Sequence, residues 1–250
     1  MASPRPAPAA EPTNVVEPVT TAAAQAPPPA EGAPLPRKKP APPPARKAKP
    51  AALAAAPQAP IKGPLQTMTA AEDRACLAAL KQAGVDFRPR GEIAEGKCGA
   101  ETPLEISAVG GIKFSTNATM RCDAARATAT WLNSVVVPAA ARHMRSAVTS
   151  VRVAASYHCR TRRGNGRSNR LSEHAVANAI DISAVTFASG ETVPVSLRRG
   201  NSPERKFQAE IRKGACPIFT TVIGPGTNAA HADHLHLDRA YRRGGYRMCR

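Results

Sequence analysis

The sequence predicts an α+β domain, a small antiparallel sheet with flanking helices, behind a long proline- and alanine-rich tail. All six histidines, all six cysteines and every Phe, Trp and Tyr lie beyond Leu65, whereas eighteen of the 25 prolines lie before it. Beyond the tail, stretches of helical and of strand periodicity follow one another. We therefore expect a tail over residues 1–66 and one folded domain over residues 67–250.

The tail cannot build a hydrophobic core. It has no large aromatic side chain, and it contains uninterrupted proline at residues 27–29 and 42–44. A segment of this composition buries too little apolar surface to offset the backbone entropy lost on folding. We expect it to be disordered and extended, and to act as a tether.

Three stretches of the domain predict helices. Residues 69–84 begin with a threonine that can cap a helix, carry apolar residues at helical spacing and end at a glycine. Residues 122–144 form a second amphipathic run, which Pro138 is expected to end or kink. Residues 203–213 form a third helix. The runs with strand character are residues 110–114, 151–157, 179–185 and 235–238.

The chain is strongly basic, with a formal net charge of +17 at pH 7. Such a charge attracts polyanions, which include nucleic acids, anionic lipids and acidic wall polymers. Only 4% of the residues are aromatic, so a platform for stacking bases is hard to build. A solvated basic surface is therefore favoured over specific recognition of nucleic acid.

The cysteines indicate the compartment. No two of them form a C-x-x-C pair, which zinc ribbons and thioredoxin-like sites require. An even number at wide spacing favours three disulfides, whose pairing the sequence does not select, over six buried thiols in a cytosolic protein. Disulfides persist in oxidising compartments, so we expect a periplasmic or secreted protein. The six are Cys76, Cys98, Cys122, Cys159, Cys216 and Cys249.

No export signal is visible in the chain. Residues 1–20 contain no apolar stretch of signal-peptide length, and the alanine-rich residues 51–56 are too few. No segment reaches the length needed to span a bilayer, so no transmembrane segment is expected. We therefore expect the export signal to precede the start of this chain.

Two short segments, residues 172–181 and 231–238, contain four of the six histidines. In a strand, His236 must face away from its two leucine neighbours, and Asp181 away from its two isoleucine neighbours, so both reach one surface. His174 approaches from the preceding loop. Two histidines and one carboxylate form the ligand set of catalytic zinc, which keeps a fourth position open. The sequence therefore predicts a Zn²⁺ site at His174, Asp181 and His236.

Two further histidines accompany the predicted ligands. His234 is placed to act as a general base, and His231 is close enough to steady an oxyanion or to help in proton transfer. The alternative is a surface patch of histidines without chemistry. A serine-hydrolase site is excluded because no G-x-S-x-G occurs, and a thermolysin-like site because no H-E-x-x-H occurs.

The first segment resembles a known family signature. Ser172, His174, Ala179 and Asp181 are similar to the S-x-H-x-x-G-x-A-x-D pattern of the LAS metallopeptidases, a group of lysostaphin-type, D-alanyl-D-alanine-cleaving and hedgehog-like zinc domains. Ala177 stands where that pattern has glycine, a departure that could alter the loop between the ligands. The resemblance implies a hedgehog-like or D-Ala-D-Ala peptidase-like fold.

The later motif His231-x-x-His234-x-His236 resembles the last motif of the same group in its murein-endopeptidase branch. That resemblance implies that the last histidine binds zinc and that the one two residues before it acts in catalysis. Residues 156–160 are similar to a strand end whose arginine faces the substrate, which implies that role for Arg160.

A closer resemblance covers the whole region from Cys76 to Cys249. This region looks like the bacterial extensin-like C-terminal domain. It is carried by R-L-S-E-H-A-x-x-N-A-I-D-I at residues 170–182, by G-P-G-x-N-A-A-H-A-D-H-x-H-L-D at residues 224–238 and by the six cysteines. It implies a zinc-dependent metallopeptidase of the cell envelope, a peptidoglycan carboxypeptidase or endopeptidase. The alternative is a zinc-containing module that binds or supports the cell wall without catalysis. The expected partner is peptidoglycan or other anionic wall material, and the oligomeric state is left open.

Overall fold

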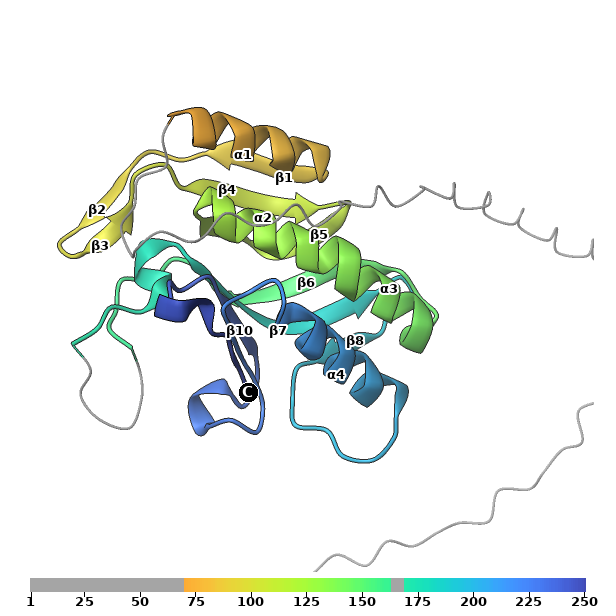
Figure 1. Cartoon of the computed structure of the whole chain (residues 1–250). Helices are drawn as coiled ribbons and strands as arrows, with labels where there is room; N and C mark the ends of the chain where they lie inside the picture. The colour runs from red at the N-terminus through yellow and green to blue at the C-terminus, as the bar shows by residue number, and fades with distance from the viewer. Residues whose placement is uncertain (1–69, 163–168) are drawn as a thin grey trace, which may run out of the picture. The chain divides into compact units, whose positions relative to one another are not determined.

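The computed structural model describes residues 70–162 and 169–250. The predicted tail over residues 1–66 lies outside these residues. Within them the chain forms an α+β domain, as the sequence predicts (Figure 1). None of the helices described is long and apolar enough to cross a bilayer.

The helical segments fall near the three predicted stretches, with short turns added in the second half. The α-helices are α1 (Ala70–Gln82), α2 (Cys122–Trp131), α3 (Val137–Ala139) and α4 (Pro203–Ala215). The π-helical segments are η1 (Leu132–Val136) and η2 (Ala140–Met144), and the 3₁₀ turns are η3 (Glu173–Val176), η4 (Ala229–His231) and η5 (Arg243–Gly245).

The strands form one large sheet and a separate hairpin. The hairpin consists of β2 (Ile93–Glu95) and β3 (Cys98–Ala100). The large sheet contains β1 (Val85–Pro89), β4 (Leu104–Val109), β5 (Ile112–Met120), β6 (Val148–Ala155), β7 (Ala179–Phe187), β8 (Thr192–Pro194), β9 (Thr221–Ile223), β10 (Leu235–Asp238) and β11 (Met248–Cys249). Its order is β1-β4-β5-β6-β7-β10-β9-β11, and β8 pairs with β7.

The large sheet has nine strands and is mixed, where the sequence predicts a small antiparallel sheet. Two pairs are parallel, β5 with β6 and β9 with β11. Parallel neighbours require a crossover connection, which carries the chain back to the end from which it started. The helical run at residues 122–144 provides this crossover and occupies most of the connection between β5 and β6.

Pro138 does not end this helical run, which continues from Cys122 to Met144. The hydrogen bonding widens to π-helical on both sides of the proline, and the N–H of Val137 donates to the carbonyl of Leu132, five residues back. Proline lacks an N–H and crowds the preceding turn, and a wider turn accommodates both defects. The run ends at Arg145 in the left-handed region, with φ 51°.

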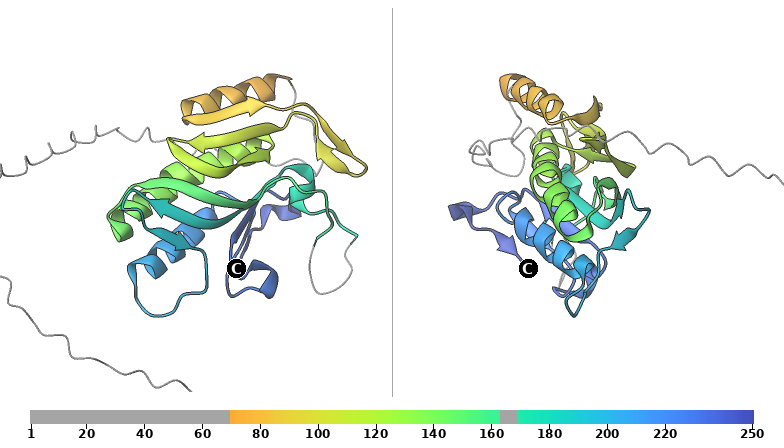
Figure 2. Two further views of the ribbon diagram at one scale, coloured as in Figure 1. Left: turned by 180° about the vertical axis from the view of Figure 1, so that it is seen from behind. Right: turned by 90° about the vertical axis from the view of Figure 1, so that its right-hand side faces the viewer.

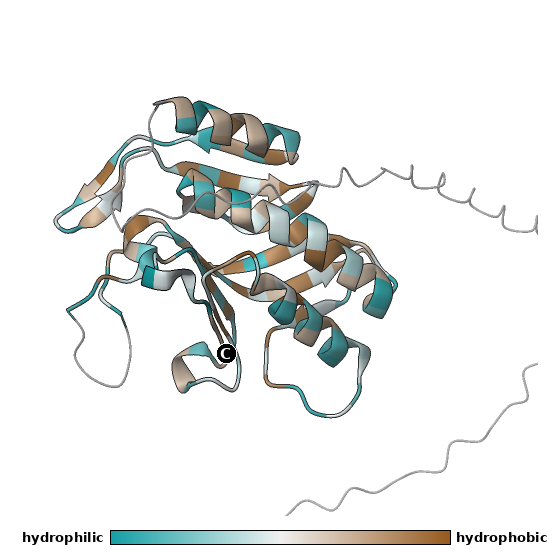
Figure 3. Ribbon diagram, viewed as in Figure 1, coloured by the Kyte–Doolittle hydropathy of each residue, from teal (hydrophilic) through white to brown (hydrophobic). Residues whose placement is uncertain are grey.

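The core lies between the sheet and the helices. Figures 1 and 2 show the long helical run and α4 together on one face of the sheet, and Figure 3 shows apolar residues concentrated along the central strands. The buried Trp131 donates its indole N–H to the carbonyl of Ile211 at 2.9 Å, which links α2 to α4. Phe187 of β7 meets Phe207 of α4 edge to face.

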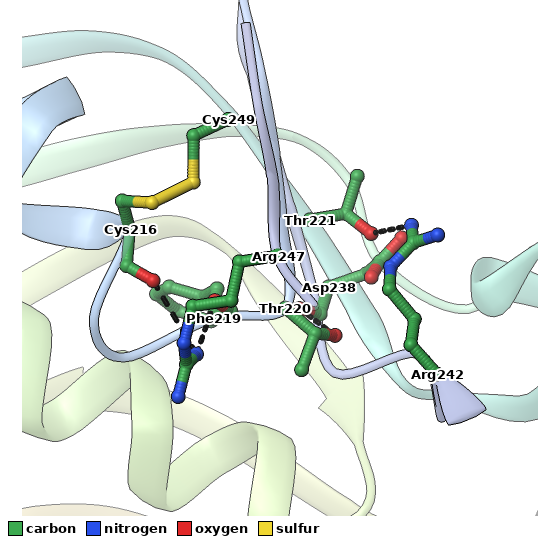
Figure 4. The surroundings of a disulfide bond; sticks show 8 residues. All are labelled: Cys216, Phe219, Thr220, Thr221, Asp238, Arg242, Arg247 and Cys249. Carbon is green, nitrogen blue, oxygen red and sulfur yellow. Dashed lines mark hydrogen bonds between the residues drawn. A yellow bond between two sulfur atoms is a disulfide. The ribbon is translucent and has the colours of Figure 1, made fainter. Parts of the chain in front are cut away.

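All six cysteines pair, which confirms the prediction of three disulfides. Cys76–Cys122 joins α1 to α2, and Cys98–Cys159 joins the hairpin to the segment that precedes Arg160. Cys216–Cys249 joins the end of α4 to the last strand (Figure 4). The first and third disulfides therefore tie α1 and β11, near the two ends of the domain, to α2 and α4, and the second holds the hairpin beside Arg160.

Candidate metal centre

The strand pair β7–β10 places two of the three predicted ligands. His236 is the direct cross-strand neighbour of Asp181. The residues on either side of them, Leu235 paired with Ile182 and Leu237 paired with Ile180, are buried in the core beneath the helices. Since side chains alternate along a strand, the histidine and the aspartate share the face that the helices leave free.

The third residue, His174, comes from the turn η3. The Ser172 hydroxyl accepts a hydrogen bond from the N–H of His174 and so begins the turn. Ala177 ends it with φ 52°, in the left-handed region that glycine adopts most readily. The alanine therefore keeps the backbone conformation that the glycine of the LAS pattern would favour.

These three side chains converge on one buried point. Their ligand atoms lie within 4.8 Å of one another, and they form the group found among the described residues that could hold a metal ion. Nε2 of His174 lies 3.2 Å and Nδ1 of His236 lies 2.9 Å from Oδ1 of Asp181, and the two nitrogens are 3.1 Å apart. The structure thus brings together the whole set predicted from the sequence.

Neighbouring groups fix which nitrogen of each imidazole faces the centre. Nδ1 of His174 donates to the carbonyl of Ser156 at 2.5 Å, so Nε2 presents a lone pair inward. Nε2 of His236 donates to Oδ2 of Asp238 at 2.9 Å, so Nδ1 faces inward. A carbonyl or carboxylate partner on the outer nitrogen is the usual support of a metal-binding histidine.

The charges of the centre are strongly coupled. Burial alone would raise the pKa of Asp181, but the contacts of its carboxylate with His174 and His236 outweigh burial and hold the pKa well below its ordinary value. Burial alone would lower the pKa of His236, but hydrogen bonds to Asp181 and Asp238 raise it to about 9. The metal-free centre therefore retains a proton on His236 at neutral pH.

His234 and His231 lie beside this centre. The His234 ring donates from Nδ1 to the carboxylate of Asp233 at 2.8 Å and turns Nε2 toward Asp181, 3.6 Å from Oδ2. The His231 ring lies 5.3 Å from that of His234 and 5.7 Å from that of His236, measured between centroids. Burial, followed by the charges of His236 and His234, lowers the pKa of His231 to about 4.

A pocket of about 160 Å³ opens next to the centre. Arg160 lines it, as do His231 and His234, so the structure gathers the predicted catalytic residues around one space. Glu173 also lines it, but its carboxylate is engaged by Arg162 at 3.1 Å and by the Asn178 amide at 2.8 Å. The remaining lining residues include Ser172, Thr221, Ile223, Ala230, His236, Asp238, Arg242 and Met248.

Sequence reasoning missed Thr221, Arg162 and Arg242 in this pocket. Thr221 comes from β9 and is the cross-strand neighbour of Asp238, a pairing that no local spacing reveals. Arg242 follows β10 by a few residues in a stretch rich in arginine, and nothing in that stretch distinguishes it from its neighbours.

Comparison with known proteins places the described domain in a family. The model of the extensin-like protein C-terminus matches residues 74–250. The chain belongs to this family. No curated protein and no solved structure matches the chain. The extensin-like match includes every residue of the candidate centre, the pocket beside it and all six cysteines.

Proposed function

We propose that this extensin-like domain is a zinc-dependent metallopeptidase of the cell envelope that hydrolyses peptide bonds in peptidoglycan. The observation that carries the proposal is the convergence of His174, Asp181 and His236 beside a pocket lined by two further histidines. Two histidines, one carboxylate and an open side are the arrangement of catalytic zinc sites. The similarity of both motifs to those of the LAS metallopeptidases supports the same assignment.

The donor set fits a cation. The lone pairs of two imidazole nitrogens and a carboxylate oxygen point at one another across 2.9 to 3.2 Å. Without a positive charge between them the lone pairs of these three atoms would repel one another, which is why the metal-free centre holds a proton. Zn²⁺ accepts nitrogen and oxygen ligands at about 2.0–2.2 Å, so His174, Asp181 and His236 would hold the ion in place of that proton.

When bound, zinc supplies Lewis acidity, which polarises a peptide carbonyl and acidifies water. The residues of the chain supply the proton transfer. His234 accepts a proton at Nε2, because Asp233 keeps the other nitrogen protonated. His231 donates from Nδ1 to Asn228 at 2.7 Å, so its Nε2 is also an acceptor. This arrangement favours a role for His231 in proton transfer over a role as a donor to an oxyanion.

The choice of substrate and compartment has separate support. Three disulfides favour an oxidising compartment, which for an envelope protein is the periplasm or the exterior. Arg160 lines the pocket. The resemblance to the LAS metallopeptidases implies that this arginine contacts the substrate. The net charge of +17 favours anionic wall material over a neutral partner.

A second candidate function is a zinc-containing wall-binding module without turnover. It is favoured by the burial of the ligands, whose side chains are 0% exposed for His174, 7% for Asp181 and 11% for His236. Such enclosure is typical of structural zinc sites. The pocket beside His236 favours the peptidase, because a structural site needs no open side.

Incubation of the zinc-loaded full chain with purified peptidoglycan distinguishes the two functions. The peptidase releases shortened peptides and new amines, which mass analysis detects, and the metal-free protein serves as the control. The wall-binding module sediments with peptidoglycan but releases no fragment. Fragments that appear equally with and without metal would contradict the zinc mechanism.

A further inference from the structure

Arg242 gives the pocket a cation that the proposed mechanism does not use. It follows β10 and lines the same pocket as His231, His234 and His236. Four of the other ionisable residues that line this space already pair with one another: Arg162 with Glu173, and Asp238 with His236. Arg242 has no ion pair with a carboxylate in the part of the chain that the structure describes.

The guanidinium of Arg242 is held in place by uncharged groups. One terminal nitrogen donates to the Thr221 hydroxyl at 2.6 Å, and the other donates to the Tyr246 hydroxyl at 3.0 Å. The Tyr246 ring lies beneath it, 5.0 Å from the guanidinium carbon. Its Nε is buried and has no hydrogen-bond partner. The group is therefore ordered before any ligand binds, and each terminal nitrogen keeps a second N–H for a ligand.

Thr221 connects this arginine to the metal centre. The Thr221 hydroxyl also hydrogen-bonds to Asp238, its cross-strand neighbour, and Asp238 holds Nε2 of His236. Figure 4 shows Arg242, Thr221 and Asp238 together on the same side of the strands. An anion at Arg242 would consequently lie in the pocket that also exposes the candidate metal ligand.

We propose that Arg242 binds a carboxylate of the peptide, so that the pocket beside the metal centre selects peptides with a free carboxylate. The planar fork of a guanidinium matches the two oxygens of a carboxylate, and a preordered fork loses little entropy on binding. The pocket is therefore expected to select peptides through their C-terminal carboxylate. That such a peptide is a substrate depends on the proposed function, whereas carboxylate binding by Arg242 does not.

Calorimetric titration of the full chain tests this inference with N-acetyl-D-alanyl-D-alanine and the same compound as its C-terminal amide. Wild type is expected to bind the acid roughly 10- to 100-fold more tightly, the range for hydrogen bonds to a charged group. Arg242→Gln is expected to remove this preference. Arg243→Gln is the matched control, because Arg243 is exposed and does not line the pocket.

Tyr246→Ala provides a second variant, since Tyr246 is 59% exposed and its loss leaves the core intact. It removes the ring and the acceptor that order Arg242, so the preference for the acid is expected to fall several-fold, with circular dichroism unchanged. If Arg242→Gln fails to fold, this variant decides the question.

The outcomes separate the inference from the proposed function. Equal binding of acid and amide, no binding of either, or inorganic phosphate binding as tightly as the acid would each overturn the inference. Retention of the preference in Arg242→Gln, or in Tyr246→Ala, would do the same. Preferential binding of the acid without cleavage of any peptide would contradict the peptidase function but support carboxylate binding by Arg242. Cleavage at equal rates of peptides with and without a C-terminal charge would support the peptidase function but contradict the inference.

Discussion

His236 lies directly opposite Asp181 across the β7–β10 pair, and its Nδ1 is 2.9 Å from the aspartate Oδ1. The flanking pairs of leucine and isoleucine bury the other face of the same two strands. A slip of one residue in this register would expose the core and bury the charged pair. The hydrophobic core therefore fixes the geometry of the candidate centre.

The first prediction concerns the metal itself. Purified protein is expected to contain about one zinc per chain, held by His174, Asp181 and His236. Alanine at any of the three is expected to reduce zinc content to near zero in elemental analysis. His143→Ala is the control, because that histidine pairs with Glu210 between the helices, away from the centre. If all three variants kept their full zinc, the ligand assignment would be wrong.

The second prediction concerns pH. The pKa of His236 is raised from 6.5 to about 9 in the metal-free protein, and zinc must displace that proton. Zinc affinity is therefore expected to rise with pH up to about 9. The raised pKa also stabilises the metal-free fold below pH 6.5, and this contribution is lost as pH rises through 9. Competition titrations with a chelator measure the affinity, and chemical unfolding of the metal-free protein measures the stability.

Asp238→Ala is the matched variant for this prediction. It removes the carboxylate that holds Nε2 of His236, so the pKa of His236 falls and the ring loses its orientation. Loss of such a supporting residue typically weakens metal binding by about 10- to 100-fold. A pH profile that is flat in wild type, or unchanged in this variant, would contradict the role assigned to the pair.

The parts of the fold that the sequence predicted are those with a strong local period. The strand 235–238 matches β10, in which leucines alternate with polar residues, and the third helix begins at Pro203 as predicted, directly after the cap residue Ser202. The strand predicted at residues 110–114 is misplaced. Gly110 and Gly111 form the turn, and β5 runs from Ile112 to Met120. Polar residues at 115–117 on its exposed part obscure the strand pattern.

The residues of the candidate centre and its pocket likewise fall into a group that the sequence predicted and a group that it did not. His174, Asp181 and His236 could be predicted because residue type and spacing within two short segments identify them. Thr221 and Arg242 could not, because β9 reaches β10 through a pairing between distant segments. The edge strands β1 and β11 were missed for the same reason, since their pairing and not their own composition makes them strands.

The third prediction concerns the disulfides. Replacement of both Cys76 and Cys122 by alanine removes a link between residues 46 apart in sequence, which is expected to lower the free energy of unfolding by about 4 kcal/mol. Chemical unfolding of wild type and variant under oxidising conditions measures this difference, which is expected to vanish under reduction. Six titratable thiols in the native protein would contradict both the pairing and the proposed compartment.

The last prediction separates the peptidase from the wall-binding module at a single residue. His234 faces Asp181 through Nε2 but does not belong to the converging set of three ligand atoms. His234→Ala is therefore expected to keep its zinc and its fold. If His234 is the general base, the rate of peptide release from peptidoglycan falls by about 10²- to 10⁴-fold, the usual contribution of a positioned acid or base.

His236→Ala is the comparison, because it removes a ligand and is expected to lose zinc and activity together. Zinc content and peptide release are measured on the same preparations of both variants. A His234→Ala protein that keeps its metal and cleaves as fast as wild type shows that His234 is not the base. The role then passes to His231, whose Nε2 is also an acceptor in the pocket. It does not pass to Glu173, because Arg162 and Asn178 already engage that carboxylate.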